Sequence, residues 1–312
     1  MRTPPKLAIP DSAVLVTAEV QKLLRAAGAI GRIPTPRADI LETLKLVQVG
    51  QLDLAEYELS RSQKAAETFH RALRKLYGFF DRRTQVVYVS PDLHASKRTF
   101  TTYHEVTHRI LPWQNFRYTE DDKQTLLPSC EELFESEANF GAADIMFQCN
   151  SFETEARDFE LSVDSALHLA DRYEASCHSS LRRFVERNHR PCTLLVLKRT
   201  TRTNPCGGMS FLISHAIPSD SFTLQFGEPF SSVFINPEDE LGRIVNSEAD
   251  GEIELIDIKG FRHTFTVELF TNQYSHFVMI YPQIARRTRK KVIRIVPPTG
   301  LATTIVERRG FL

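Results

Sequence analysis

Apolar residues in the first part of the chain recur mostly at the spacing of amphipathic helices. From Ser12 to about Ala29 they fall on one helical face, and Gly28 is expected to end that helix. The same spacing predicts further helices over residues 38–49, 52–76, 97–111 and 129–148. The chain therefore begins with a largely helical region, preceded by a short Pro-rich arm.

Two segments add detail to this helical region. Residues 83–91 are β-branched and aromatic and are bounded by Pro91, which predicts a short strand. Residues 162–188 contain two short amphipathic segments separated by a turn near Ala175, which is the pattern of a helix–turn–helix.

After Pro191 the pattern changes to short runs of β-branched, aromatic and aliphatic residues separated by Gly, Pro, Asn and Asp. These β-like runs cover residues 194–197, 222–226, 253–258, 263–270 and 277–281. Helices followed by strands predict the α+β fold class. We expect three domains: a helical core with a small sheet over residues 1–155, a helix–turn–helix subdomain over 156–190, and a β-rich domain over 191–312.

Composition narrows the classes of partner and location. The 312 residues are 42% hydrophobic, and Lys+Arg equals Asp+Glu at 39 each, so net charge gives no reason to expect nucleic acid or membrane as the main partner. No uncharged apolar run reaches the roughly 18 residues of a spanning helix, and the N-terminus does not resemble a signal peptide. Five cysteines without a CxxC pair argue against a disulfide framework or a cysteine zinc site, and a reducing, cytoplasmic location is expected.

The strongest chemical signal is His104-Glu105-x-x-His108, which lies within a predicted helix. Residues four apart share a helical face, so the two imidazoles can bind one cation at the roughly 2.0–2.1 Å typical of zinc. Glu105 is offset by about 100° around the helix and can reach a water on the metal without being a ligand. Zinc brings the pKa of such a water towards about 7, so Glu105 can act as general base and then general acid. The alternative is a surface helix with solvated side chains.

A catalytic zinc site needs a third protein ligand, and the helix predicted at 129–148 offers four glutamates. Ala138, Ala142 and Ile145 form the stripe of this helix that must pack inward, and Glu135 lies on that stripe. Periodicity thus favours Glu135 as the third ligand. The remaining three are expected to be solvated or to interact with the helix dipole. They are Glu131, Glu132 and Glu137.

The segment from Arg98 to His108, followed by Glu135-Ser-Glu-Ala-Asn-Phe-Gly-Ala-Ala, resembles the ImmA/IrrE-type metallopeptidase family. The resemblance covers roughly residues 15–197. In that family the first Glu of the second segment is the third zinc ligand, which implies Glu135 here. The resemblance also implies a zincin-like peptidase core, and a GAF-like sensor is one interpretation of the C-terminal domain.

The resemblance further implies a function. Members of the family cleave transcriptional repressors with Xre-type helix–turn–helix domains, which relieves repression in stress responses or mobile-element control. The expected partner is thus a protein substrate of this kind. The sequence departs from the family where Asp144-Ile-Met-Phe-Gln lacks the usual proline and where Gly141 replaces a commoner Phe. These changes affect packing, not the expected ligands.

Other features have less specific interpretations. Arg182, Arg183 and Arg187 could contact DNA, but the helix–turn–helix also carries acidic residues, and a bracing or docking role is the simpler interpretation. The basic run at 286–291 is expected to be a solvated turn. No oxyanion-stabilising residue is assigned, since Tyr103 points to another helical face. A non-proteolytic, zinc-stabilised regulator that binds repressor or DNA is the alternative function.

Overall fold

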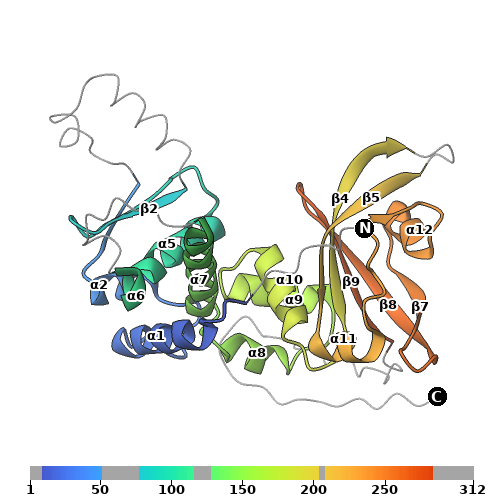
Figure 1. The fold of residues 1–312 in the computed structure, drawn as a ribbon, viewed down its shortest axis with the longest axis horizontal. Coiled ribbons are helices and arrows are strands. Elements are labelled where there is room, and N and C mark those ends of the chain that lie inside the picture. The colour runs from blue at the N-terminus through green and yellow to red at the C-terminus, as the bar shows by residue number, and fades with distance from the viewer. Residues whose placement is uncertain (1–8, 51–76, 116–127, 204–207, 284–312) are drawn as a thin grey trace, which may run out of the picture. The chain divides into compact units, whose positions relative to one another are not determined.

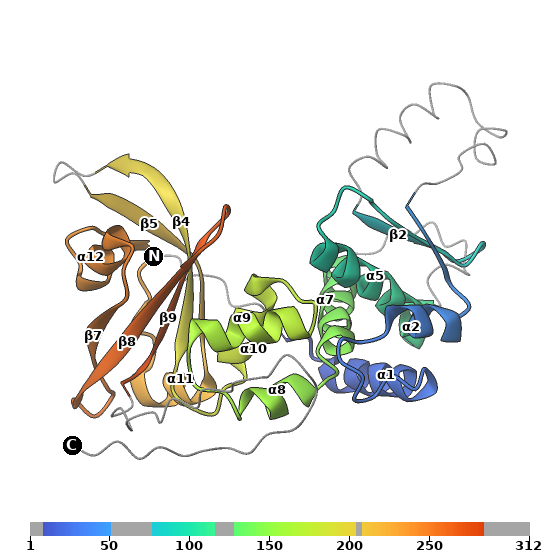
Figure 2. The same ribbon diagram turned by 180° about the vertical axis from the view of Figure 1, so that it is seen from behind.

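Ten helices and two β-sheets make up the part of the chain that this computed structural model describes, namely residues 9–50, 77–115, 128–203 and 208–283 (Figures 1 and 2). The α+β fold class is confirmed. The helix predicted at 52–76 and the basic run at 286–291 lie outside the described residues.

The first two helices differ in how well the sequence predicted them. Helix α1 (Ala13–Ala26) matches the prediction. Helix α2 (Arg37–Thr43) is shorter than predicted, because Lys45 adopts a left-handed conformation (φ 55°) and the chain leaves the helix there. The following residues form strand β1 (Val47–Val49), so the prediction of helix as far as residue 49 was wrong. Two β-branched valines in a three-residue segment favour the strand, which pairs in parallel with β3.

The small sheet has the strand order β1-β3-β2. The predicted strand is β3 (Val86–Val89), whose Val87 and Val89 are buried. Strand β2 (Gly78–Asp81) pairs with it in antiparallel fashion and was not predicted, because four residues are too few to show a strand period. Among the described strands, β2 is paired on one side only and forms an edge of this sheet.

Helices α5 (Ala95–Ile110) and α7 (Pro128–Met146) correspond to the two predicted helices that carry the candidate ligands, and they lie against each other (Figure 1). The inward stripe predicted for α7, Ala138, Ala142 and Ile145, is fully buried. The short helix α6 (Pro112–Asn115) begins at the proline that ends the preceding helix, since proline is well suited to the first turn.

The predicted helix–turn–helix is present as α9 (Val163–Arg172) and α10 (Cys177–Glu186). Each helix has a serine N-cap. The side chain of Ser162 accepts from the backbone N–H of Ser165, and the side chain of Ser176 accepts from the backbone N–H of Ser179. The short helix α8 (Ser151–Ala156), which was not predicted, connects α7 to this unit.

The large sheet is antiparallel throughout, with strand order β6-β5-β4-β9-β8-β7. Its strands are β4 (Thr193–Thr203), β5 (Met209–Pro218), β6 (Phe234–Ile235), β7 (Gly251–Ile256), β8 (Arg262–Thr271) and β9 (His276–Pro282).

Helices cover both faces of this sheet. On β4, Leu194 and Val196 belong to a core shared with α9 and α10, whereas Leu195 and Leu197 face a second core. That second core includes α11 (Asp220–Phe226) and α12 (Glu240–Ser247). A strand buried on both faces is expected to be continuously apolar rather than alternating, which explains the run at 194–197.

One predicted strand of the C-terminal region was wrong. Residues 222–226 belong to helix α11, whose N-cap Ser219 accepts from the backbone N–H of Phe222. Phe222 and Phe226 lie four residues apart and both are buried on one helical face. A five-residue run with aromatic ends does not distinguish the strand period of 2 from the helical period of 3.6. The capping serine favours the helix.

The described helices and sheets belong to one compact unit that ends at Pro282. The predicted domain boundaries after residues 155 and 190 stay predictions. No helix among the described residues is both long and apolar enough to cross a membrane.

Candidate metal centre

Three predicted ligands meet between α5 and α7. The Nε2 atoms of His104 and His108 lie 3.2 Å apart. Glu135 places one carboxylate oxygen 3.3 Å from Nε2 of His104 and the other 3.6 Å from Nε2 of His108. Within the described part of the chain, these side chains form the group of three or more that could hold a metal ion.

The separations of these atoms fit a zinc ion. Ligand atoms about 2.0–2.1 Å from the metal in a tetrahedron are about 3.3–3.4 Å from one another. The observed separations of 3.2, 3.3 and 3.6 Å lie close to this value. Two imidazoles and one carboxylate are also a donor set of catalytic zinc sites, which bind water or substrate at the fourth position.

The outer nitrogen of each imidazole contacts a side-chain amide. His104 Nδ1 lies 3.1 Å from Asn139 Oδ1, and His108 Nδ1 lies 2.7 Å from Gln114 Oε1. Because an amide oxygen only accepts, each Nδ1 of the neutral imidazoles carries the hydrogen in this arrangement and each Nε2 presents a lone pair. Two lone pairs and a carboxylate then face one another, and a cation is the group that satisfies all three.

Glu105 lies beside the ligands in a closely packed position. A Cβ atom at Gly78 would be 2.8 Å from Glu105 Oε1 and 2.4 Å from a methyl group of Thr101, so only glycine lets β2 approach α5 this closely. Burial raises the pKa of Glu105 above its usual 4.5, against the lowering effect of the His104 and His108 charges. A bound dication would lower this pKa again. A carboxyl group whose pKa is shifted towards about 7 suits a general base.

Glu135 and His108 influence each other's protonation. In the metal-free protein, hydrogen bonds that the protonated imidazoles of His104 and then His108 donate to the carboxylate hold the pKa of Glu135 far below its usual 4.5. Burial acts to lower the pKa of His108, but hydrogen bonds to Glu135 and Gln114 and the nearby carboxylate charges outweigh it, so the pKa lies above 6.5. A proton and a metal ion therefore compete for this site.

The ligands open onto a cleft of about 900 Å³ between β2, α5 and α7. One side of the cleft is aromatic, because Tyr77, Phe79, Phe80 and Phe100 line it. Phe79 is 39% exposed on the edge strand β2. The cleft thus combines an apolar wall, an exposed strand edge and the candidate metal ligands.

The other residues considered for the site do not belong to this group of candidate ligands. Glu132 is exposed, as expected for a solvated position on α7. The same expectation was wrong for Glu137, which is 2% exposed and hydrogen-bonded. Tyr103 is buried and its hydroxyl donates to the carbonyl of Thr35, with burial raising its pKa, so it does not face the cleft.

Sequence reasoning missed three residues that contact the site. Asn139 follows Glu135 by four residues, so helical spacing would have placed it on the same face. Gln114 lies in the short helix after α5, where no periodic pattern indicated a role. Gly78 contacts Glu105 only through the pairing of β2, which the sequence did not predict.

The three arginines of the helix–turn–helix that were considered for DNA differ in exposure. Arg183 is 8% exposed and pairs with Asp144 at 3.3 Å and with Glu153 at 2.7 Å. Arg182 pairs with Glu186 on the same helix, and Arg187 is exposed. Of the three arginines considered for DNA, one is therefore committed to a buried ion pair.

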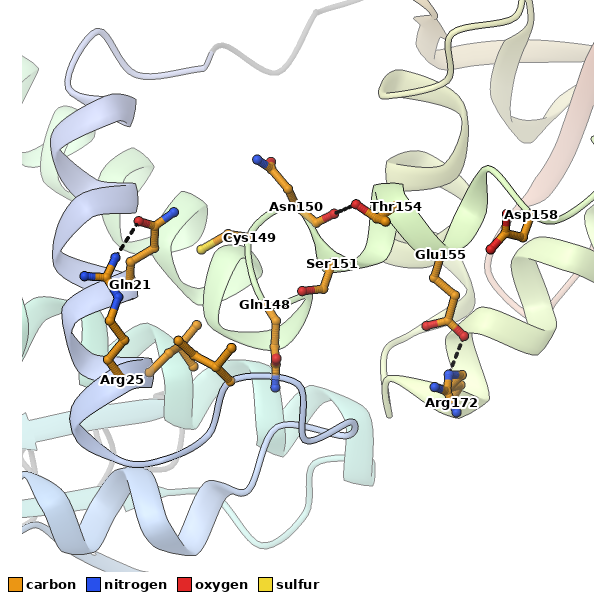
Figure 3. Close-up of a pocket in the computed structure, with 12 residues that line it drawn as sticks. Gln21, Arg25, Gln148, Cys149, Asn150, Ser151, Thr154, Glu155, Asp158 and Arg172 are labelled. Carbon is orange, nitrogen blue, oxygen red and sulfur yellow. Dashed lines mark hydrogen bonds and ion pairs between the residues drawn. The ribbon is translucent and has the colours of Figure 1, made fainter.

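A second pocket, of about 760 Å³, lies between α1 and the turn that joins α7 to α8 (Figure 3). Its polar side chains contact one another: Arg25 donates to Gln21 at 3.1 Å, and Arg172 pairs with Glu155 at 2.5 Å. No triad of metal-ligating side chains was found here among the described residues. The cleft at His104 is the better candidate for a reactive site.

Comparison with known proteins adds a distant likeness. No family model matches the chain, and no curated protein matches it. A solved structure of a Mycobacterium tuberculosis transcriptional regulator is similar, with 11% sequence identity and a TM-score of 0.49 over 85% of this chain and 74% of that chain. A likeness of this extent carries no conclusion about activity.

Proposed function

We propose that the protein is a zinc-dependent endopeptidase. The observation that supports this most directly is the convergence of His104, His108 and Glu135 at zinc-ligand spacing, with the buried carboxyl group of Glu105 beside them. Zinc bound there would act as a Lewis acid that lowers the pKa of coordinated water and polarises the scissile carbonyl.

The residues of the chain then have distinct roles. Glu105 takes a proton from the attacking water and passes it to the leaving amine. Asn139 and Gln114 orient the two imidazoles through their Nδ1 atoms. The close packing of Gly78 against Glu105 restricts water around that carboxyl group and keeps its pKa raised.

The substrate is best described as an extended peptide segment. The edge of β2 borders the cleft, and an extended chain can add to such an edge through backbone hydrogen bonds. The aromatic wall of Tyr77, Phe79 and Phe100 suits an apolar side chain of that segment. The resemblance to ImmA/IrrE-type peptidases suggests an Xre-type repressor as the protein that carries it.

The variant Glu105→Gln tests the enzymatic proposal. We expect it to retain about one zinc per chain, because Glu105 is not a ligand, and to lose cleavage by about a hundredfold or more. Zinc is measured by elemental analysis. Cleavage is measured with a purified Xre-type repressor as the substrate. Glu132→Gln is the matched control, since Glu132 is an exposed glutamate on α7 away from the cleft lining.

Two outcomes would contradict the proposal. Absence of bound zinc in the gently purified wild type would remove its basis. Undiminished cleavage by Glu105→Gln would exclude the proposed base. If Glu105→Gln instead still relieves repression in cells and His104→Ala does not, the protein is a non-proteolytic, zinc-stabilised regulator.

A further inference from the structure

Glu137 is a buried carboxyl group with an unusual set of partners. Its Oε2 accepts from Gln114 Nε2 at 2.7 Å and from Trp113 Nε1 at 2.9 Å, and its Oε1 accepts from the hydroxyl of Ser12. Three donors from two other segments thus converge on one carboxylate. A single residue links Glu137 to the candidate ligand His108, because Gln114 contacts both side chains.

The chemistry of these groups fixes the direction of each hydrogen bond. An ionised carboxylate only accepts, so the Gln114 amide must turn its NH₂ towards Glu137. Its oxygen then faces His108, where it can only accept from Nδ1–H. His108 must therefore carry its hydrogen on Nδ1 and leave Nε2 free, which is the tautomer that a metal ligand needs at that atom.

We propose that Glu137 is a positioning residue that sets the tautomer of His108 through Gln114. The consequence for zinc affinity rests on the proposed metal site, whereas the tautomer itself is a property of the metal-free protein. Glu137 contacts neither substrate nor metal, and its effect passes through one amide that can face only one way.

His104 provides an internal contrast. Its Nδ1 contacts Asn139, but Asn139 is exposed, and within the described residues no carboxylate accepts from its amide nitrogen. Among the described residues, no second contact fixes which end of the Asn139 amide faces His104. The two imidazoles of the site are therefore held differently, and Glu137 should affect His108 alone.

The variant Glu137→Gln separates the direction of the hydrogen bonds from the shape of the side chain. A glutamine has one oxygen, so it either keeps that oxygen towards Trp113 and Gln114, as in the wild type, or turns its NH₂ towards them, loses the bond from Trp113 and donates to Gln114 Oε1. The Gln114 amide can then turn over and present NH₂ to His108, which favours the hydrogen on Nε2. We expect His108 to change from the Nδ1–H form to a mixture, and zinc affinity to fall by about 10- to 100-fold.

The first measurement uses the full metal-free chain. Imidazole ¹⁵N chemical shifts, recorded at a pH above the imidazole titration, report which nitrogen carries the hydrogen. Zinc affinity is then measured by competition with a chelator, and circular dichroism verifies folding. Glu132→Gln removes the same charge from an exposed position of α7 and should change neither readout. Gln114→Leu is a second variant, which should also release the tautomer while Trp113 and Ser12 still hold Glu137.

The outcomes distinguish this proposal from the proposed function. A tautomer change at His108 in a wild-type protein that binds no zinc would support the role of Glu137 and defeat the peptidase. Unchanged His108 tautomers in folded Glu137→Gln and Gln114→Leu would overturn the role of Glu137, whatever the zinc content. An equal change at His104 would also overturn it.

Discussion

At the scale of single residues, the candidate site places one carboxylate beside two imidazoles that can become positively charged. Without a metal, an imidazole that is protonated forms an ion pair with Glu135, whose oxygens lie 3.3 and 3.6 Å from the Nε2 atoms of His104 and His108. The raised pKa of His108 and the lowered pKa of Glu135 express the same interaction. The stability that it contributes must therefore depend on pH.

We expect this contribution to be greatest between about pH 4.5 and 6.5 in the metal-free protein. A raised imidazole pKa stabilises the fold fully below the usual 6.5, and the gain is lost as pH rises through the folded value. A lowered carboxyl pKa stabilises above the usual 4.5, and that gain is lost as pH falls through the folded value.

The measurement is the difference in melting temperature between wild type and Glu135→Gln, both metal-free, across pH. Because the Glu135 side chain is 58% exposed, screening should keep the difference to about 1 kcal/mol or less, a few degrees at most. Added zinc should stabilise the wild type further at the alkaline end, where protons no longer compete. A difference that does not vary with pH would contradict the ion pair.

The sequence was sufficient to predict that these three candidate ligands lie together, because their geometry is local. His104 and His108 are one helical turn apart, and the inward stripe of α7 indicated Glu135. Gln114 and Glu137 could not be predicted, because their link depends on how α6 returns against α7 after the chain has left α5. Sequence spacing carries no information on such contacts.

At the scale of elements, the site depends on how closely α5 approaches α7. Gly141 permits this approach: a Cβ atom there would be 2.4 Å from Thr107 Cγ2 and 3.1 Å from a methyl group of Val16. Thr107 directly precedes the candidate ligand His108, and Gly141 lies on the helix that carries Glu135. The spacing of these two helices therefore determines the distance between the ligands.

Gly141→Ala should destabilise the protein although alanine is the better helix former. The helical preference favours alanine by about 1 kcal/mol, whereas overpacking costs about 1–3 kcal/mol, so a net loss of up to about 2 kcal/mol is expected. Urea denaturation measures it. Adding Thr107→Ser removes the clashing methyl group and keeps the hydroxyl that donates to the carbonyl of Tyr103, so stability should partly return. A stabilised single variant would show that the helices are not closely packed at this position.

Elements were predicted well where periodicity ran long and poorly where it was short. Helices α1, α5 and α7 and the pair α9 and α10 each span enough turns to show an apolar face. Strand β1 and helix α11 were assigned to the wrong class, because three to seven residues do not separate a period of 2 from one of 3.6.

At the scale of the whole molecule, one buried arginine joins helices that are distant in sequence. Arg183 of α10 pairs with Asp144 of α7 and Glu153 of α8, and it donates to the carbonyl of Cys149. Asp144 also accepts from Thr17 of α1 at 2.6 Å. Four helices thus meet around a single cation, of whose two carboxylate partners Asp144 is buried and Glu153 partly buried.

Arg183→Ala should cost about 3–5 kcal/mol of unfolding free energy, because it leaves the buried carboxyl group of Asp144 and the partly buried one of Glu153 without their cation. Arg182→Ala, one residue earlier, removes only a partly exposed pair with Glu186 and should cost less than about 1 kcal/mol. Chemical denaturation of both variants gives the comparison. Equal losses would mean that the buried pair has no special importance for the fold.

The hydrogen bond from Ser12 to the Glu137 carboxylate has a practical consequence for preparing the protein. The first residue before α1 and the imidazole of His108 are separated by only two side chains. An affinity tag, a shortened N-terminus or a protease scar placed next to Ser12 should therefore alter the surroundings of a candidate metal ligand far along the chain. Metal content should be compared only between preparations that begin at the same residue.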